Sequence, residues 1–397
     1  MNTRRVDTLT SLRFFAAVSI VVHHLKSSQL WIPQDAISHF GLGQQVSLFF
    51  VLSGYILHLN YRNSLKRIPA FHFIFLRFMR LWPAHLFAML MVLILFSPWV
   101  ITWFENNLTW SQILQVVFLV QAFNPDSRVG YAINVVSWSI SAELFFYVLF
   151  PLLSRLVRRH GWRAIAGVGV LTLTYLVVAQ ALFDGHVFAD AQALGYLNPC
   201  ARVLEFTLGI WACEIAFRSD GRSRPWSFGW GSAVELTVLG IVIGTEYISM
   251  PVAAMAGQAT GSVVSIYVAS TLPFPTFAAL IFVLHRQAGA VSALLRHPSL
   301  VRLGDWSFAL YLLHYAIIQW FKTAVAPGTP LLGQIAMFCT VLLGGSAFVF
   351  TFVEQPTIAW AKLWLGWRRR PVLPSAMHAD LPSATVLDPR ERLLANR

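Results

Sequence analysis

An arginine and a histidine share one face of the first apolar segment. Arg13 and His24 are eleven positions apart in LRFFAAVSIVVHH. Eleven residues at about 100° each return almost to the same side of a helix, and at about 1.5 Å per residue the two lie roughly 16 Å apart. The unperturbed pKa of an imidazole is about 6.5, so His24 is a candidate general base at neutral pH. The alternative is that His24 is an interfacial residue and that the side chain of Arg13 extends to the aqueous face.

Further polar groups interrupt the later apolar runs. Glu143 follows Ser139 by about one turn in SWSISAELFFYVLFP. An isolated carboxylate at that depth must be neutralised or paired with a cation or an imidazole. Tyr311 and His314 are three positions apart in SFALYLLHY and share a helix face. Each such group within a membrane is a functional candidate until a structural partner explains it.

Arginines near the second and third apolar runs are candidates for binding phosphate. Arg77 and Arg80 are three apart in FLRFMRLWP and share one helix face, an arrangement suited to bidentate phosphate contacts. Arg62 and Arg67 follow the second run and are further candidates. The alternative is that these arginines only set the membrane topology.

Other patterns favour structural roles. Arg202 and Glu205, three apart in ARVLEFTLG, favour a self-contained ion pair, with substrate binding as the alternative. Ser53 and Gly54, in SLFFVLSGYIL, favour close helix packing. Glu354, in VEQP, follows the last apolar run and suggests the end of a helix. The cysteines show no paired metal-ligand spacing, so no metal site is expected.

The composition excludes an ordinary soluble protein. The 397 residues are 57% hydrophobic and 12% charged, whereas soluble domains carry about 25% charged residues. Lipid must then surround most side chains, and apolar runs of about 20 residues are expected. The net charge of +12 would suggest nucleic acid in a soluble protein, but the arginines cluster between apolar runs. That placement indicates membrane topology, and no nucleic-acid partner is expected.

The expected fold is an all-α polytopic membrane protein with about ten transmembrane helices. The stretch 113–123 is about half the length of a span, so 102–134 is expected to be one outer excursion. Pro273 and Pro275 predict a break in the eighth span. Basic clusters then fall on one side, so both termini are expected to be cytoplasmic. The expected spans are 9–25, 46–59, 81–101, 135–156, 164–183, 200–217, 231–249, 263–285, 305–325 and 331–352. Residues 1–356 would form the membrane domain, and the proline-rich tail 357–397 would be largely disordered.

In this order, the polar segments resemble the membrane acyltransferase-3 family over residues 9–356. Each motif alone is weakly specific, but their succession on successive spans is strongly so. The motifs of that family are matched by Arg13 and His24, by Arg77, Arg80 and Pro83, by Trp138, Ser139 and Glu143, and by Tyr311 and His314.

The resemblance implies an acyl-CoA donor on the cytoplasmic side, most simply acetyl-CoA, and a hydroxyl acceptor on an extracytoplasmic carbohydrate. The protein would then lie in the inner membrane. His24 would act as general base, Glu143 would orient its ring, and Arg13, Tyr311 and His314 would stabilise the oxyanion or gate the passage. The donor phosphates would be held by Arg77, Arg80, Arg62 and Arg67, and the acceptor by Trp138, Ser139, Arg202 and Glu205.

Two alternative functions stay open. A transporter or flippase of a lipid-linked glycan would use buried histidine, glutamate and arginine as a substrate or proton path. An O-acyltransferase of a small hydroxylated metabolite would differ only in its acceptor.

Overall fold

The computed structural model describes residues 5–33, 41–65, 68–96, 108–183, 191–220, 225–325 and 328–366. These ranges are helical and contain no strand. Arg67 and the tail from residue 367 lie outside them, as do residues 97–101 of the expected third span and residues 102–107 of the expected outer excursion.

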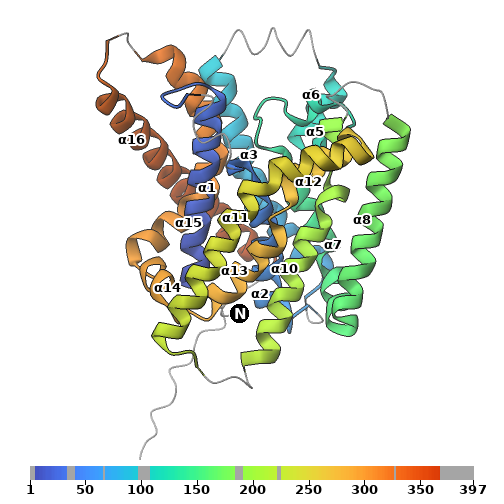
Figure 1. Cartoon of the computed structure of the whole chain (residues 1–397). Helices are drawn as coiled ribbons and strands as arrows, with labels where there is room; N and C mark the ends of the chain where they lie inside the picture. Colours follow the sequence, from blue (N-terminus) through green and yellow to red (C-terminus); the bar gives the residue numbers. More distant parts are fainter. Residues whose placement is uncertain are drawn as a thin grey trace, which may run out of the picture.

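Long helices account for most of the chain (Figure 1). They are α1 (Asp7–Ser27), α2 (Gln45–Tyr61), α3 (Ala70–Phe96), α7 (Trp138–His160), α8 (Trp162–Phe183), α10 (Pro199–Asp220), α11 (Phe228–Thr260), α15 (Pro298–Ala324) and α16 (Leu331–Val349). The shorter helices are α5 (Trp110–Val117), α6 (Ser127–Gly130), α12 (Ser262–Thr271), α13 (Phe274–His285), α14 (Ala290–Leu295) and α17 (Gln355–Trp364). Single turns are η1 (Leu42–Gln44), η2 (Gln121–Phe123), η3 (Ala193–Leu197) and η4 (Phe350–Glu354).

Eight helical stretches of the described residues are long and apolar enough to cross a membrane, so the chain is a multi-pass membrane protein. Each overlaps one of eight expected spans, but the third begins at Ala70 instead of at residue 81, so Arg77 and Arg80 lie inside it. The two other expected spans correspond to α10 and α15, which are long enough but carry more polar residues. Several of those polar residues, including Arg202, Glu205 and His314, are fully buried among other helices. A hydropathy average counts such side chains as if they faced lipid, which is why these two helices score lower.

Local sequence signals explain two departures from simple spans. The eighth span is broken as expected, because α12 ends at Thr271 and α13 begins at Phe274, with Pro273 in the N-cap position. In the outer excursion, α5 has eight residues and is therefore only about 12 Å long, which is too short to cross a core of about 30 Å. At the other end of the chain, α17 is helical to Trp364, past the domain boundary expected at residue 356.

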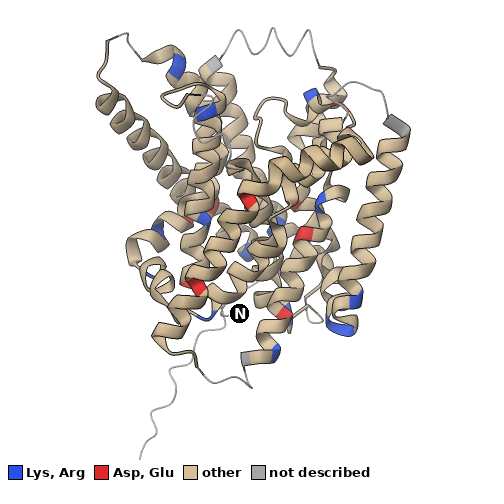
Figure 2. Ribbon diagram, in the orientation of Figure 1, with Lys and Arg blue, Asp and Glu red and all other residues tan. Residues whose placement is uncertain are grey.

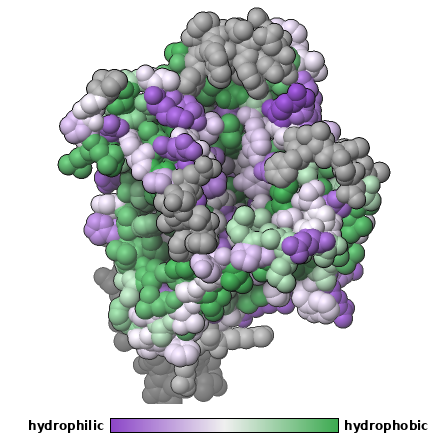
Figure 3. All heavy atoms as spheres, turned by 45° about the horizontal axis from the view of Figure 1, so that its top comes forward, coloured by the Kyte–Doolittle hydropathy of each residue, from purple (hydrophilic) through white to green (hydrophobic). Residues whose placement is uncertain are grey.

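Basic side chains gather at one end of the bundle, drawn at the bottom in Figure 2. We call this the basic end. It is where α1, α8 and α15 begin and where α7 and α10 end (Figure 1). The opposite end, where α1 ends and α7 begins, is called the distal end, and Figure 3 shows hydrophilic residues gathered around a hollow there. The basic residues in terminal turns at the basic end include Arg158, Arg159, Arg163, Arg218 and Arg302.

The closest helix crossing joins α2 and α10. A Cβ added at Gly54 would lie 2.0 Å from the carbonyl oxygen of Phe206, and one added at Gly209 would lie 1.9 Å from that of Val51. The two backbones therefore touch, as small residues permit in membrane helices. The packing role expected for Gly54 is confirmed.

We expect Gly209→Ala to destabilise the fold by about 1–3 kcal/mol or more, because the added methyl group must force α2 and α10 apart. The measurement is the thermal unfolding midpoint of the purified protein in detergent. The matched control is Gly240→Ala in α11, where an added Cβ has no neighbour within 4 Å. Equal midpoints for the two variants would show that the backbones do not touch at Gly209.

Candidate active site

Two histidines from distant parts of the chain meet near the distal end. The ring centroid of His24 on α1 lies 5.2 Å from that of His314 on α15, and 5.2 Å from that of Tyr315. His24 is half-buried, whereas His314 is fully buried. The sequence pattern separated these residues by most of the chain, and the packing of α1 against α15 brings them together.

The hydrogen bonding of His314 fixes its neutral tautomer. Its Nδ1 lies 2.6 Å from the carbonyl oxygen of Tyr311, which only accepts hydrogen bonds, so Nδ1 carries the proton. Its Nε2 is buried and has no hydrogen-bond partner among the described residues. A neutral His314 therefore offers an unused acceptor nitrogen beside the ring of His24.

A hydrogen bond connects two of the predicted motifs. The hydroxyl groups of Tyr311 on α15 and Ser139 on α7 lie 2.8 Å apart. The Ser139 hydroxyl also lies 2.9 Å from the carbonyl oxygen of Val136. Trp138 is buried against the ring of Tyr196, at 4.4 Å between centroids. The Tyr311–Ser139 hydrogen bond therefore joins α15 to α7 about one turn from His314, and Trp138 packs α7 against η3.

Three helices bring charged side chains together below this level, and α2 adds a hydroxyl group. Glu143 on α7 accepts a hydrogen bond from Ser53 on α2, at 2.9 Å, and another from Tyr147. Arg13 on α1 interacts electrostatically with Glu143, Tyr147 and Arg80 of α3. Arg13 and Arg80 have no hydrogen-bond partner among the described residues, so their guanidinium groups are available to a ligand. We call Arg13, Arg80, Glu143 and Tyr147 the central cluster.

The structure gives Glu143 different partners from the one expected. Its hydrogen bonds among the described residues come from Ser53 and Tyr147, and none joins it to His24. Glu143 lies four residues along α7 from Ser139, which places it about 6 Å deeper in the bundle. His24 meets His314 instead. The expected role of Glu143 as the partner of that imidazole therefore has no contact to support it.

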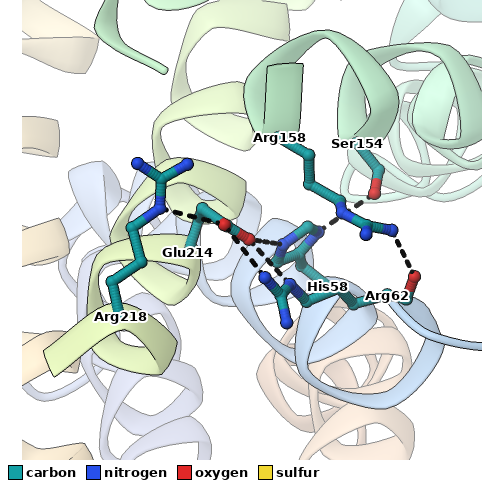
Figure 4. Close-up of polar contacts among 6 residues, drawn as sticks. All are labelled: His58, Arg62, Ser154, Arg158, Glu214 and Arg218. Carbon is teal, nitrogen blue, oxygen red and sulfur yellow. Dashed lines mark hydrogen bonds and ion pairs between the residues drawn. The ribbon is translucent and has the colours of Figure 1, made fainter. Parts of the chain in front are cut away.

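Arg62 has a structural partner. Its Nε and Nη2 atoms donate to the two carboxylate oxygens of Glu214 at 2.8 and 3.1 Å. Glu214 also contacts His58 and Arg218, and Arg158 donates to the carbonyl oxygen of Arg62 (Figure 4). This ion pair occupies the guanidinium that was expected to bind a donor phosphate. Only the four-residue spacing of Glu214 and Arg218 hinted at the cluster in the sequence.

Arg77 is partly committed as well. Its Nη2 donates to the hydroxyl of Tyr61 at 2.5 Å, and its guanidinium lies over the rings of Tyr61, Phe73 and Tyr147 at 4.9 to 5.9 Å. Its Nε is buried without a hydrogen-bond partner in the described part of the chain. Of the four predicted phosphate ligands, Arg80 is thus the least engaged, and Arg67 is not described.

Arg202 and Glu205 form a fully buried ion pair. Nε of Arg202 lies 2.7 Å from Oε2 of Glu205, and Nη2 donates to Oε1 at 3.1 Å and to Ser47 at 2.9 Å. The guanidinium also lies over the rings of Phe50 and Tyr196 at 5.4 and 5.2 Å. Both charged residues have no exposed surface, so their geometry supports the ion-pair interpretation over substrate binding.

Sequence reasoning gave Ser53 only a packing role, and it missed Tyr147 and the inward position of Glu354. Tyr147 could have been found, because it lies four residues after Glu143. Glu354 does not end a helix: the π turn η4 leads directly into α17. Its side chain is buried and interacts electrostatically with Arg80.

Comparison with known proteins identifies the family. A model of an acyltransferase domain matches residues 6–350. The chain belongs to the acyltransferase-3 family. Within this family it is 29% identical over 398 residues to acyltransferase MdmB of Streptomyces mycarofaciens, covering 93% of this chain and 94% of that protein.

Two further relatives are more distant. The exopolysaccharide production protein ExoZ of Rhizobium meliloti is 26% identical over 325 residues, covering 81% of this chain and 91% of that protein. The O-acetyltransferase OatA of Staphylococcus aureus is 25% identical over 343 residues, covering 82% of this chain and 53% of OatA. No solved structure matches this chain.

Proposed function

We propose that this acyltransferase moves a short acyl group, most simply acetyl, from cytoplasmic acyl-CoA to a hydroxyl group of an extracytoplasmic carbohydrate. An exopolysaccharide or O-antigen unit would be a suitable acceptor. The names of ExoZ and OatA support this class of acceptor and this acyl group. The observation that carries the proposal is the meeting of His24 and His314 at the distal end, above the central cluster.

The proposed reaction is direct transfer. Neutral His24 accepts the proton of the acceptor hydroxyl while that oxygen attacks the thioester carbonyl carbon. A carbon–oxygen bond forms, the carbon–sulfur bond breaks, and the leaving thiolate takes the proton from His24 to give free CoA and a neutral imidazole. His314 is close enough to His24 to position its ring, or to receive the proton at the free Nε2.

The arginines of the central cluster serve the donor in this proposal. Arg13 lies eleven residues from His24 on α1, about 16 Å along the helix, so both cannot contact one thioester carbonyl. We assign Arg13 and Arg80 to the donor's path instead of to the oxyanion. Guanidinium groups that form no hydrogen bond within the described part of the chain are suited to charged or polar parts of a donor.

The orientation of the protein in the membrane can be inferred from the position of the basic end. Lysine and arginine are enriched in cytoplasmic segments of membrane proteins, so we propose that the basic end faces the cytoplasm of a bacterial inner membrane. Donor would enter there, and acceptor would approach His24 from the distal end. The hydrophilic hollow in Figure 3 supports that approach.

The test uses purified protein in nanodiscs with acetyl-CoA labelled in the acetyl group and a panel of oligosaccharides and small hydroxylated metabolites. Label on an oligosaccharide supports the proposal, and label only on a small metabolite would change the acceptor class. Glycan movement across a vesicle membrane without any label transfer would favour the flippase instead.

A further inference from the structure

A cavity of about 290 Å³ opens at the basic end, where α1 begins and α14 is followed by α15. No motif discussed above includes it. Its lining is strongly charged for a membrane protein of this composition. The lining residues are Arg5, Asp7, Arg296, Pro298, Val301, Arg302 and Asp305.

The two acids of this cavity are already paired, whereas two of its arginines are not. Nε of Arg5 lies 2.9 Å from Asp7, and its Nη2 lies 3.1 Å from Asp305. Arg296 and Arg302 have no ion-pair or hydrogen-bond partner among the described residues, and both are exposed. Two guanidinium groups are therefore unpaired, and three arginines against two acids give the lining a net charge of +1, which suits an anion that accepts several hydrogen bonds.

Backbone groups at the cavity add to this preference. α15 begins here with His297 as N-cap, without a side-chain cap and without an acid in its first turn. The first backbone N–H groups of a helix lack internal partners and carry partial positive charge. Pro298 removes one of these donors, and those of the next residues remain. The N-terminus of α15 and the two arginines thus favour an anion together.

The cavity also lies at the base of the proposed donor path. Just inside it, α1 and α15 touch, because a Cβ at Gly304 would lie 2.1 Å from the carbonyl oxygen of Thr10. Asp305 of the cavity interacts electrostatically with Arg13 of the central cluster. Along α1, Asp7 and His24 are separated by about 26 Å at 1.5 Å per residue. The cavity and the proposed base are thus at opposite ends of the same helix.

We propose that this cavity binds the phosphate monoester on the ribose of the acyl-CoA donor. The inference rests on the proposed function, since it names the part of the donor that enters the cavity. A phosphate monoester carries a charge of about −1.5 to −2 at pH 7 and three acceptor oxygens. Two unpaired guanidinium groups and a helix terminus offer more donors than the two free oxygens of a phosphodiester in a lipid headgroup can accept, and they suit the three acceptor oxygens of a monoester.

The test compares acetyl-CoA with acetyl-dephospho-CoA, which lacks this monoester. We expect the wild-type protein to prefer acetyl-CoA by about tenfold or more in kcat/KM, because hydrogen bonds to charged groups each contribute about 1.5–3 kcal/mol. In the double variant R296Q/R302Q the preference should disappear through a higher KM for acetyl-CoA. Its kcat should stay within about twofold, since neither arginine contacts the reacting atoms.

The matched control is Arg159→Gln, which removes an exposed arginine from the same end of the molecule but not from the cavity. This variant should keep the wild-type preference. An unchanged preference in R296Q/R302Q would overturn the inference, and loss of bound anionic lipid in native mass spectra of that active variant would assign the cavity to a lipid phosphate. A wild-type protein that transfers nothing from acetyl-CoA would contradict the proposed function itself.

Discussion

Replacing His24 with alanine is expected to lower the rate of acyl transfer by about 10²-fold to 10⁴-fold, the usual loss when a general base is removed. The reason is that His24 combines partial exposure with a ring contact to His314, at 5.2 Å between centroids. The measurement is the initial rate of label transfer from acetyl-CoA to the acceptor at saturating concentrations. His24 is half-buried, so thermal unfolding of the variant must be checked alongside the rate.

His23→Ala is the matched control for this experiment. The ring of His23 faces the loop before α2, since a Cβ at Gly43 would lie 3.3 Å from it. We expect this variant to keep most of its activity. If His23→Ala were inactive and His24→Ala active, the assignment would be one residue out of register. If only His314→Ala were inactive, the free Nε2 of His314 would be the base.

The second large effect is on stability. Arg202→Met should destabilise the protein by about 3–5 kcal/mol, because it leaves the carboxylate of Glu205 buried without its counter-ion. Both residues are fully buried, and Glu205 loses two hydrogen bonds with the guanidinium. The measurement is the unfolding free energy in mixed micelles, with the yield of folded protein as a second readout.

The double variant R202M/E205L tests the reason for that loss. Replacing a buried ion pair by apolar residues of similar size is often close to neutral, so the double variant should be much more stable than Arg202→Met alone. An exposed pair provides the control: Arg128→Ala removes the ion pair with Asp126 at 2.7 Å and should cost about 0–1 kcal/mol. Equal losses in the single and double variants would mean that the pair is not the source of the stability.

The sequence predicted the membrane fold and most of the span positions, because hydrophobic runs of membrane length have few alternative structures. The break at Pro273 could be predicted for the same kind of local reason, since proline lacks the N–H that an unbroken helix needs. The helix faces were also predictable. Tyr311 and His314 do lie on one side of α15, toward α7 and α1.

What the sequence could not provide was the helix that each face meets. Glu143 and His24 were both expected in the distal half, but residue spacing contains no information about the rotation of α7 against α1. The same limit applies to Arg62, whose partner Glu214 is 152 residues away. A charged side chain near a helix end looks the same in sequence whether it binds a ligand or another helix. The π turn that carries Glu354 inward likewise leaves no pattern in the residues.

The contact between α2 and α10 limits how the molecule can move. Their backbones touch at Gly54 and Gly209. Arg202 and Ser47 join them near one end, and Glu214 and Arg62 near the other. Sliding α2 along α10, or separating the two helices, would break buried charged contacts at both ends. We therefore expect α2 and α10 to move as one rigid unit. Any opening that admits or releases a bulky acceptor would then come from other helices moving relative to α2 and α10. Much of the surface of α16 faces outward, so α16 is the helix that we expect to move.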